Sequence, residues 1–102
     1  MKAAFISAIK ALRDKNVPPL EAASQLKASG QFDLDLFKEI ILDESVQISV
    51  RQRAMFIGAA SGDTAFIVFL ANEFVLNHNP KRSLGMFSDA KDICEQHGMR
   101  FQ

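Results

Sequence analysis

The sequence contains no tryptophan, no tyrosine and only one cysteine, Cys94, in 102 residues. A single cysteine cannot form an internal disulfide, which favours a protein of a reducing compartment such as the cytoplasm. The nine aromatic residues are all phenylalanines, which bring apolar area without a polar group, so they favour a core role over the stacking of sugars or bases. Twelve basic residues balance twelve acidic ones, so no net field attracts nucleic acid or an anionic membrane.

The chain also lacks an apolar run long enough to cross a bilayer, for which about 20 residues are needed. Its most apolar segment, Ala65–Leu76, is shorter than that. An apolar stretch after Lys2 resembles the start of a signal peptide, but Lys10 ends it and no convincing cleavage site follows. We therefore expect a soluble, cytoplasmic protein with no membrane partner, folded as a single domain over residues 1–102.

Apolar residues recur at helical spacing along the chain, and the segments between these stretches contain residues that typically begin or end helices. The pattern predicts an all-α domain of five or six short helices. Proline starts the second helix near Pro18, Asp33 can cap the third, and Gly30 and Gly98 are placed to end helices in the left-handed conformation. The predicted helices cover about residues 2–14, 18–30, 32–42, 49–62, 63–77 and 84–97.

The start of the fourth helix allows two interpretations. Val46, Ile48 and Val50 alternate with polar residues, as they would in a strand. Ser49 and Gln52, however, match a capping box, in which the two side chains bind the free backbone N–H groups of a helix start. Because the apolar stretch also continues beyond the usual length of a strand, we favour a helix.

The fifth predicted helix is apolar at nearly every position, with Asn72 and Glu73 as its only polar residues between Ala65 and Leu76. A helix that is apolar on all sides has to be enclosed. We therefore expect the other helices to pack around it, with Phe69 as a core residue. If Phe69 instead lies in an exposed apolar patch, it belongs to an interface.

An alanine stands eight residues before a helix-ending glycine three times in the chain. The pairs are Ala22 and Gly30, Ala54 and Gly62, and Ala90 and Gly98. A small residue lets two helices approach closely, and the spacing of 32 and then 36 residues between these units suits stacked helical hairpins. Since alanine and glycine are both common, a chance match remains open.

Residues 46–76 resemble one HEAT-type repeat. The resemblance rests on Val50-Arg51, Ala54, Gly58 and Gly62-Asp63, followed by the apolar Val68 and Leu70. It implies a short HEAT-like solenoid of stacked antiparallel hairpins that binds another protein. The helical pattern by itself also allows an irregular orthogonal bundle.

The residues that could carry chemistry form no recognisable site. Cys94 and His97 lie three apart on one predicted helix, and His78 is the only other histidine, so the further ligands of a zinc site are missing. Cys94 continues an apolar stripe, which predicts a buried and unreactive thiol. The sequence also lacks a phosphate-binding loop, a dinucleotide-binding fingerprint and a nucleophile elbow. We therefore predict no catalytic, cofactor-binding or metal-binding residue, and no enzyme activity.

Two functions fit these patterns. The first is a non-catalytic protein-binding module, such as a small adaptor, chaperone or inhibitor, with self-association as a homodimer as one option, because a short solenoid has uncovered apolar ends. The candidate partner-binding residues are Arg51, Arg53, Phe69 and Phe101. The alternative is a helix-turn-helix regulator whose helix starting at Ser49 presents Arg51 and Arg53 to DNA. The neutral net charge argues against this alternative.

Overall fold

The computed structural model describes residues 2–77 and 85–101, which form six α-helices and one π-helix and contain no strand. The predicted all-α class is therefore confirmed. The helices are α1 (Lys2–Asp14), α2 (Pro19–Ala28), α3 (Leu34–Leu42), α4 (Ile48–Ala60), α5 (Thr64–Leu70) and α6 (Phe87–Gln96), and α5 continues directly into the π-helix η1 (Ala71–Leu76). Leu84, which the sequence pattern assigns to the last helix, lies outside the described residues.

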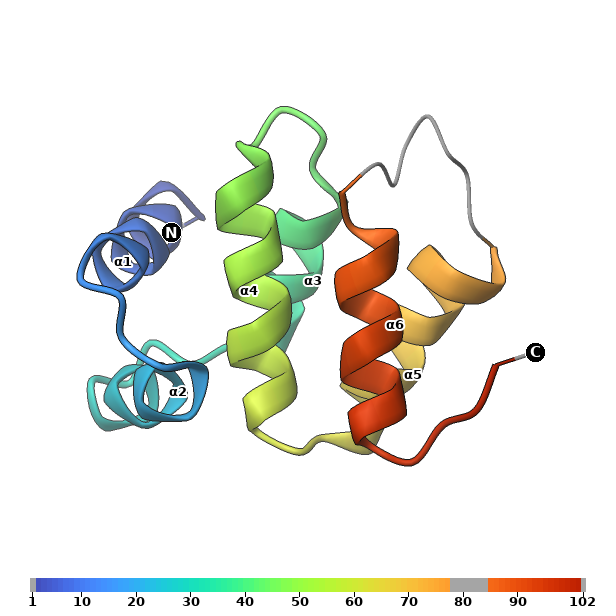
Figure 1. Cartoon of the computed structure of the whole chain (residues 1–102). Coiled ribbons are helices and arrows are strands. Elements are labelled where there is room, and N and C mark those ends of the chain that lie inside the picture. Colours follow the sequence, from blue (N-terminus) through green and yellow to red (C-terminus); the bar gives the residue numbers. More distant parts are fainter. Residues whose placement is uncertain (1, 78–84, 102) are drawn as a thin grey trace.

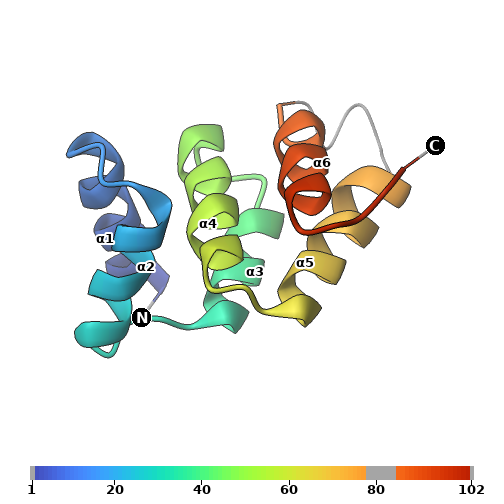
Figure 2. The same cartoon turned by 60° about the horizontal axis from the view of Figure 1, so that its bottom comes forward.

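The helices lie in three neighbouring layers (Figure 1, Figure 2). Helices α1 and α2 form the first layer, α3 and α4 the second, and α5, η1 and α6 the third. α3 packs against α4, and η1 against α6, whereas α1 and α2 make their main contacts with α4. The first layer is thus attached to the rest of the protein mainly through α4.

The central element is α4, which packs against α1, α2, α3, α5 and α6. Its buried residues include the small Ala54 and Gly58, which let neighbouring helices approach closely. The prediction that the other helices pack around the fifth helix is wrong, because α5 and η1 make their main contacts with each other, α4 and α6. Val68 on α5 and Leu76 on η1 are 39% and 64% exposed. Both elements belong to the last layer, where the described part of the chain places no further helix on their outer side (Figure 2).

Three helix starts follow from their local sequence and confirm the predictions. α2 begins at Pro19, in the first turn, where the missing N–H of proline costs nothing. The carboxylate of Asp33 accepts hydrogen bonds from two N–H groups in the first turn of α3, at 3.0 and 3.2 Å. The carboxylate of Asp63 accepts one from the N–H of Phe66 at 2.9 Å, at the start of α5.

Residues 46–50, whose apolar side chains alternate as in a strand, lead into α4, which begins at Ile48. The capping box predicted for Ser49 and Gln52 is absent. The N-cap residue of α4 makes no side-chain hydrogen bond to the helix, and Ser49 and Gln52 lie within it. The Oγ of Ser49 accepts a hydrogen bond from Arg13 at 2.6 Å, and the side-chain amide of Gln52 donates one to the carbonyl of Gly85 at 2.6 Å. Both side chains therefore connect α4 to other elements and leave its own first turn uncapped.

The helices α2, α4 and α6 share the alanine and glycine pattern seen in the sequence. Each is followed by a glycine with a positive φ angle, which favours glycine over other residues. The glycines are Gly30 (φ 72°), Gly62 (φ 77°) and Gly98 (φ 91°), and the alanines are Ala22, Ala54 and Ala90, all fully buried. The eight-residue spacing thus corresponds to the same local structure in all three layers.

Helical spacing predicts Leu20 on one core-facing stripe with Ala23 and Leu26, and His97 on another with Ala90 and Cys94, but both Leu20 and His97 are exposed. Leu20, in the first turn of α2, is 68% exposed, because Ala23 and Leu26 form the side of α2 that is buried. His97 is the C-cap residue of α6, and its Nδ1 lies 2.9 Å from the carbonyl oxygen of Ile93. The core positions predicted for Leu20 and His97 are therefore wrong.

Candidate protein-binding surface

Exposed apolar side chains on α5 and η1 form the first part of the candidate surface. Of the large hydrophobic residues exposed in the described ranges, Val68 and Leu76 lie on this continuous helix, about two turns apart. Exposed Asn72 lies between them on the same side. The result is a stripe on the outer side of the last layer that is apolar at both ends and polar at Asn72 between them.

A groove borders the stripe where η1, α6 and the C-terminal segment meet. It has a volume of about 370 Å³. Its lining residues are Val75 and Leu76 from η1, Phe87 and Lys91 from α6, and Arg100 and Phe101 from the C-terminal segment. We call this site the η1–α6 groove. Together with Val68 it makes up what we call the end face.

The C-terminal segment reaches this position because α6 ends in a tight turn at Gly98. The N–H of Gly98 donates to the carbonyl of Glu95 at 3.1 Å, and the N–H of Met99 donates to that of Cys94 at 3.0 Å. In an extended segment successive side chains point to opposite sides. Met99 and Phe101 are accordingly half-buried against the core, whereas Arg100 is exposed.

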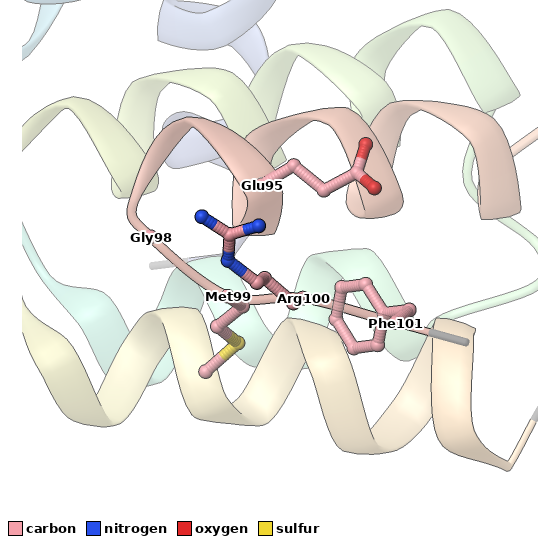
Figure 3. A pocket seen from close by; sticks show the side chains of 5 residues that line it. All are labelled: Glu95, Gly98, Met99, Arg100 and Phe101. Atoms are coloured by element: carbon pink, nitrogen blue, oxygen red, sulfur yellow. The ribbon is translucent and has the colours of Figure 1, made fainter.

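A second groove lies beside the turn at Gly98 and shares Arg100 and Phe101 with the η1–α6 groove. It has a volume of about 550 Å³ and is lined by Glu95, Gly98, Met99, Arg100 and Phe101. Figure 3 shows Glu95 on α6 and the side chains of Met99, Arg100 and Phe101 spread along the segment that follows the turn. The second groove is thus lined by one acidic side chain, Glu95, and one basic side chain, Arg100.

Arg51 and Arg53, which the sequence predicts to bind a partner, donate hydrogen bonds to backbone carbonyl groups within the protein. Arg51 is 4% exposed, and its Nε donates to the carbonyl of Ile41 at 2.9 Å in the last turn of α3. Half-buried Arg53 donates to the carbonyl of Leu12 in the last turn of α1 and to that of Val17 in the segment between α1 and α2. Helix ends leave carbonyl groups without partners and carry partial negative charge, so both cations stabilise the ends of other helices.

The two predicted aromatic residues lie in different surroundings. Phe69 is half-buried, with its ring centre 5.9 Å from that of Phe66 and 5.6 Å from the Nζ of Lys38. Phe101 lines both grooves of the last layer. Of the four candidate residues, only Phe101 therefore belongs to the end face.

Sequence reasoning missed the residues that surround Phe101. Leu76, Lys91 and Arg100 come from three separate elements, and only the turn at Gly98 brings the last of them back towards η1. The glycine signal for that turn was present in the sequence, but the direction of the following segment depends on packing against η1 and α6.

Cys94 is buried and accompanied by no metal site. Its Sγ lies 3.6 Å from the carbonyl oxygen of Ile67, and burial raises the pKa of the thiol, with the charge of Glu95 adding to the effect. Within residues 2–77 and 85–101, no group of three or more His, Cys, Asp and Glu side chains is arranged to hold a metal ion. His78 lies outside the described residues.

We expect the native protein to react with a thiol reagent slowly. Since Cys94 is fully buried, reaction requires a local opening, and the rate should be roughly a hundredfold below that of the urea-unfolded chain. A Leu20→Cys variant supplies the matched control, because Leu20 is 68% exposed and a thiol there should react at once. Rapid labelling of both thiols in the folded variant would contradict the buried position of Cys94.

Comparisons with models of protein families, with curated proteins and with solved structures found no match to this chain. The resemblance to a HEAT-type repeat is therefore supported only by the pattern of residues 46–76. In the described ranges, no helix is both long enough and apolar enough to cross a membrane.

Proposed function

We propose that this chain is a non-catalytic protein-binding module and that the end face is its binding surface. The observation that carries the proposal is the exposure of Val68 (39%) and Leu76 (64%) on one side of the last layer, next to the η1–α6 groove. Leu76 joins the apolar lining of the groove, and a contiguous apolar patch on the surface of a domain usually marks an interaction site. A role as an adaptor, chaperone or inhibitor fits such a surface.

The position of the end face at the edge of the stack supports the same proposal. In stacked helical pairs each layer covers the apolar side of its neighbour, and no helix within residues 2–77 and 85–101 covers the outer side of the last layer (Figure 2). A partner protein, or a second copy of the chain, would take the place of the missing layer. Self-association, a cytoplasmic location and a HEAT-like repeat architecture belong to this proposal.

The alternative of a helix-turn-helix DNA-binding regulator has less support. Base readout needs side chains that reach the edges of the bases. Arg51 is 4% exposed and Arg53 donates to the carbonyl of Leu12 in the last turn of α1, so neither is free to do so. Salt-sensitive binding of the purified protein to duplex DNA would revive this alternative.

A Leu76→Asp variant tests the proposed surface. A charge at the centre of an apolar contact should weaken partner binding by more than tenfold, roughly the loss seen at interface hot spots. The thermal stability should stay close to that of the wild type, because Leu76 is 64% exposed and exposed substitutions usually change stability by about 0.5 kcal/mol or less. Affinity capture from the source cells and light scattering of the purified protein measure the two forms of association.

Leu20→Asp is the matched control for this experiment. Leu20 has the same side chain and a similar exposure of 68%, but it lies on α2 in the first layer. The wild type and Leu20→Asp should retain the same partner or the same dimer mass, while Leu76→Asp loses it. If all three proteins capture the same set of proteins and have the same mass, the end face is not the binding surface.

A further inference from the structure

We propose that the η1–α6 groove binds an apolar segment of a partner protein that carries acidic side chains. This inference rests on the proposed function and specifies the chemistry of the partner. The groove combines four apolar residues with two cations, drawn from η1, α6 and the C-terminal segment.

The apolar part of the groove consists of Val75, Leu76, Phe87 and Phe101. Val75, Phe87 and Phe101 are half-buried, so contacts within the protein already restrict the movement of these side chains. Leu76 is the most exposed of the four. A partner that covers them gains apolar contact with little loss of side-chain freedom on this side. The groove therefore favours a ligand with apolar side chains of its own.

The charged part of the groove consists of Lys91 and Arg100. Among the described residues, neither takes part in an ion pair within the chain. Other surface cations of this protein do have such partners: Lys2 lies 2.5 Å from Asp43, and Arg13 lies 3.1 Å from Asp14. Lys91 and Arg100 are thus available to carboxylates from outside the chain.

No acidic residue in the described ranges lines the η1–α6 groove. Glu95 follows Lys91 by one helical turn but lines the second groove, with Arg100 lining both, so the charged residues that line the η1–α6 groove are both cations. The whole chain is neutral, so this local excess is a property of the site. Complementary charge selects partners and speeds their association, in addition to the affinity supplied by apolar contact.

The π-helix adds a structural reason to expect binding at this position. Its wider turn is closed by the N–H of Asn77, which donates to the carbonyl of Asn72 at 3.2 Å. π-helical turns are rare and occur frequently at functional sites. Two of the apolar residues of the groove, Val75 and Leu76, come from this turn.

Selection from a phage-displayed library of random short peptides on the immobilised full chain tests the inference. Enriched peptides should combine apolar residues with Asp or Glu and carry a net negative charge. The Lys91→Glu/Arg100→Glu variant should enrich basic peptides instead. For the best acidic peptide, this variant should reduce the affinity measured by fluorescence anisotropy at least about tenfold, with a smaller effect at high salt.

Lys10→Glu/Lys15→Glu is the control with the same change in net charge, because Lys10 and Lys15 are exposed cations on and just after α1. It should select the same acidic peptides as the wild type. Absence of enrichment, enrichment without a charge preference, or an equal loss in both double variants would overturn the inference. The Leu76→Asp and Leu20→Asp comparison does not depend on peptide charge, so the proposed function can succeed where this inference fails.

Discussion

Replacing Phe37 with Ala is expected to remove a large part of the protein's stability. Phe37 lies on α3, is fully buried, and its ring contacts those of Phe5, Phe32 and Phe66 at centre-to-centre distances of 4.9, 5.1 and 6.4 Å. These rings come from α1, from the segment before α3 and from α5, so one side chain joins all three layers. Truncating a buried phenylalanine costs about 3–5 kcal/mol.

That cost is large for a chain of 102 residues, whose total stability is expected to be about 5–15 kcal/mol. A loss of this size should lower the Tm by roughly 12–40 °C in a domain of this length. Circular dichroism at increasing temperature measures the shift, and urea unfolding gives the free energy.

Phe69→Ala is the control for this variant. Phe69 is only half-buried and contacts Phe66 and Lys38, so its truncation removes less buried surface. It should destabilise the protein clearly less than Phe37→Ala. The reverse order would mean that α5 is the centre of the core, as the apolar sequence of that helix alone suggests.

The helices themselves could be predicted because their signals are local. Asp33 and Asp63 accept hydrogen bonds from N–H groups within a few residues, and the positive φ of Gly98 ends α6 at the predicted position. No distant residue is needed to produce these features, so the sequence pattern was sufficient.

The choice of the central helix could not be made in the same way. α5 is more apolar than α4, yet α4 is in the middle, because burial depends on which side of an element other elements occupy. Arg51 illustrates the difficulty: it is polar in sequence, but it is buried because the carbonyl of Ile41 at the end of α3 accepts its hydrogen bond. That partner is ten residues away and is set by the packing of α3 on α4.

The candidate surface could be predicted only in part from the sequence, because it also depends on how the elements pack. The sequence analysis expected uncovered apolar ends in a short stack and named Phe101 as a partner-binding residue, but it did not connect the two. The cations Lys91 and Arg100 line the same groove only because the turn at Gly98 directs the C-terminal segment towards η1. The sequence does not show this arrangement.

Replacing Gly58 with Ala is expected to destabilise the protein, although the same change in an exposed helix interior stabilises it by about 1 kcal/mol. A Cβ atom at Gly58 would lie 2.6 Å from Cε2 of Phe66 and 3.0 Å from Cε1. The Phe66 ring cannot move away freely, because it is fully buried between the rings of Phe37 and Phe69. Overfilling a packed core costs about 1–3 kcal/mol, so α4 and α5 should be forced apart at this point.

The expected net loss is about 2 kcal/mol, or a Tm lowered by roughly 8–16 °C. A second substitution tests whether the clash with Phe66 is the cause. Phe66→Leu alone removes ring atoms from the core and should also destabilise, but in the double variant Gly58→Ala/Phe66→Leu the added methyl group fills space that the ring has left. The double variant should therefore lose less stability than the sum of the two single variants, with a coupling of about 0.5–3 kcal/mol. Strict additivity, or a gain in stability from Gly58→Ala alone, would show that α4 and α5 do not meet closely at Gly58, and the place of α5 beside the central helix would have to be revised.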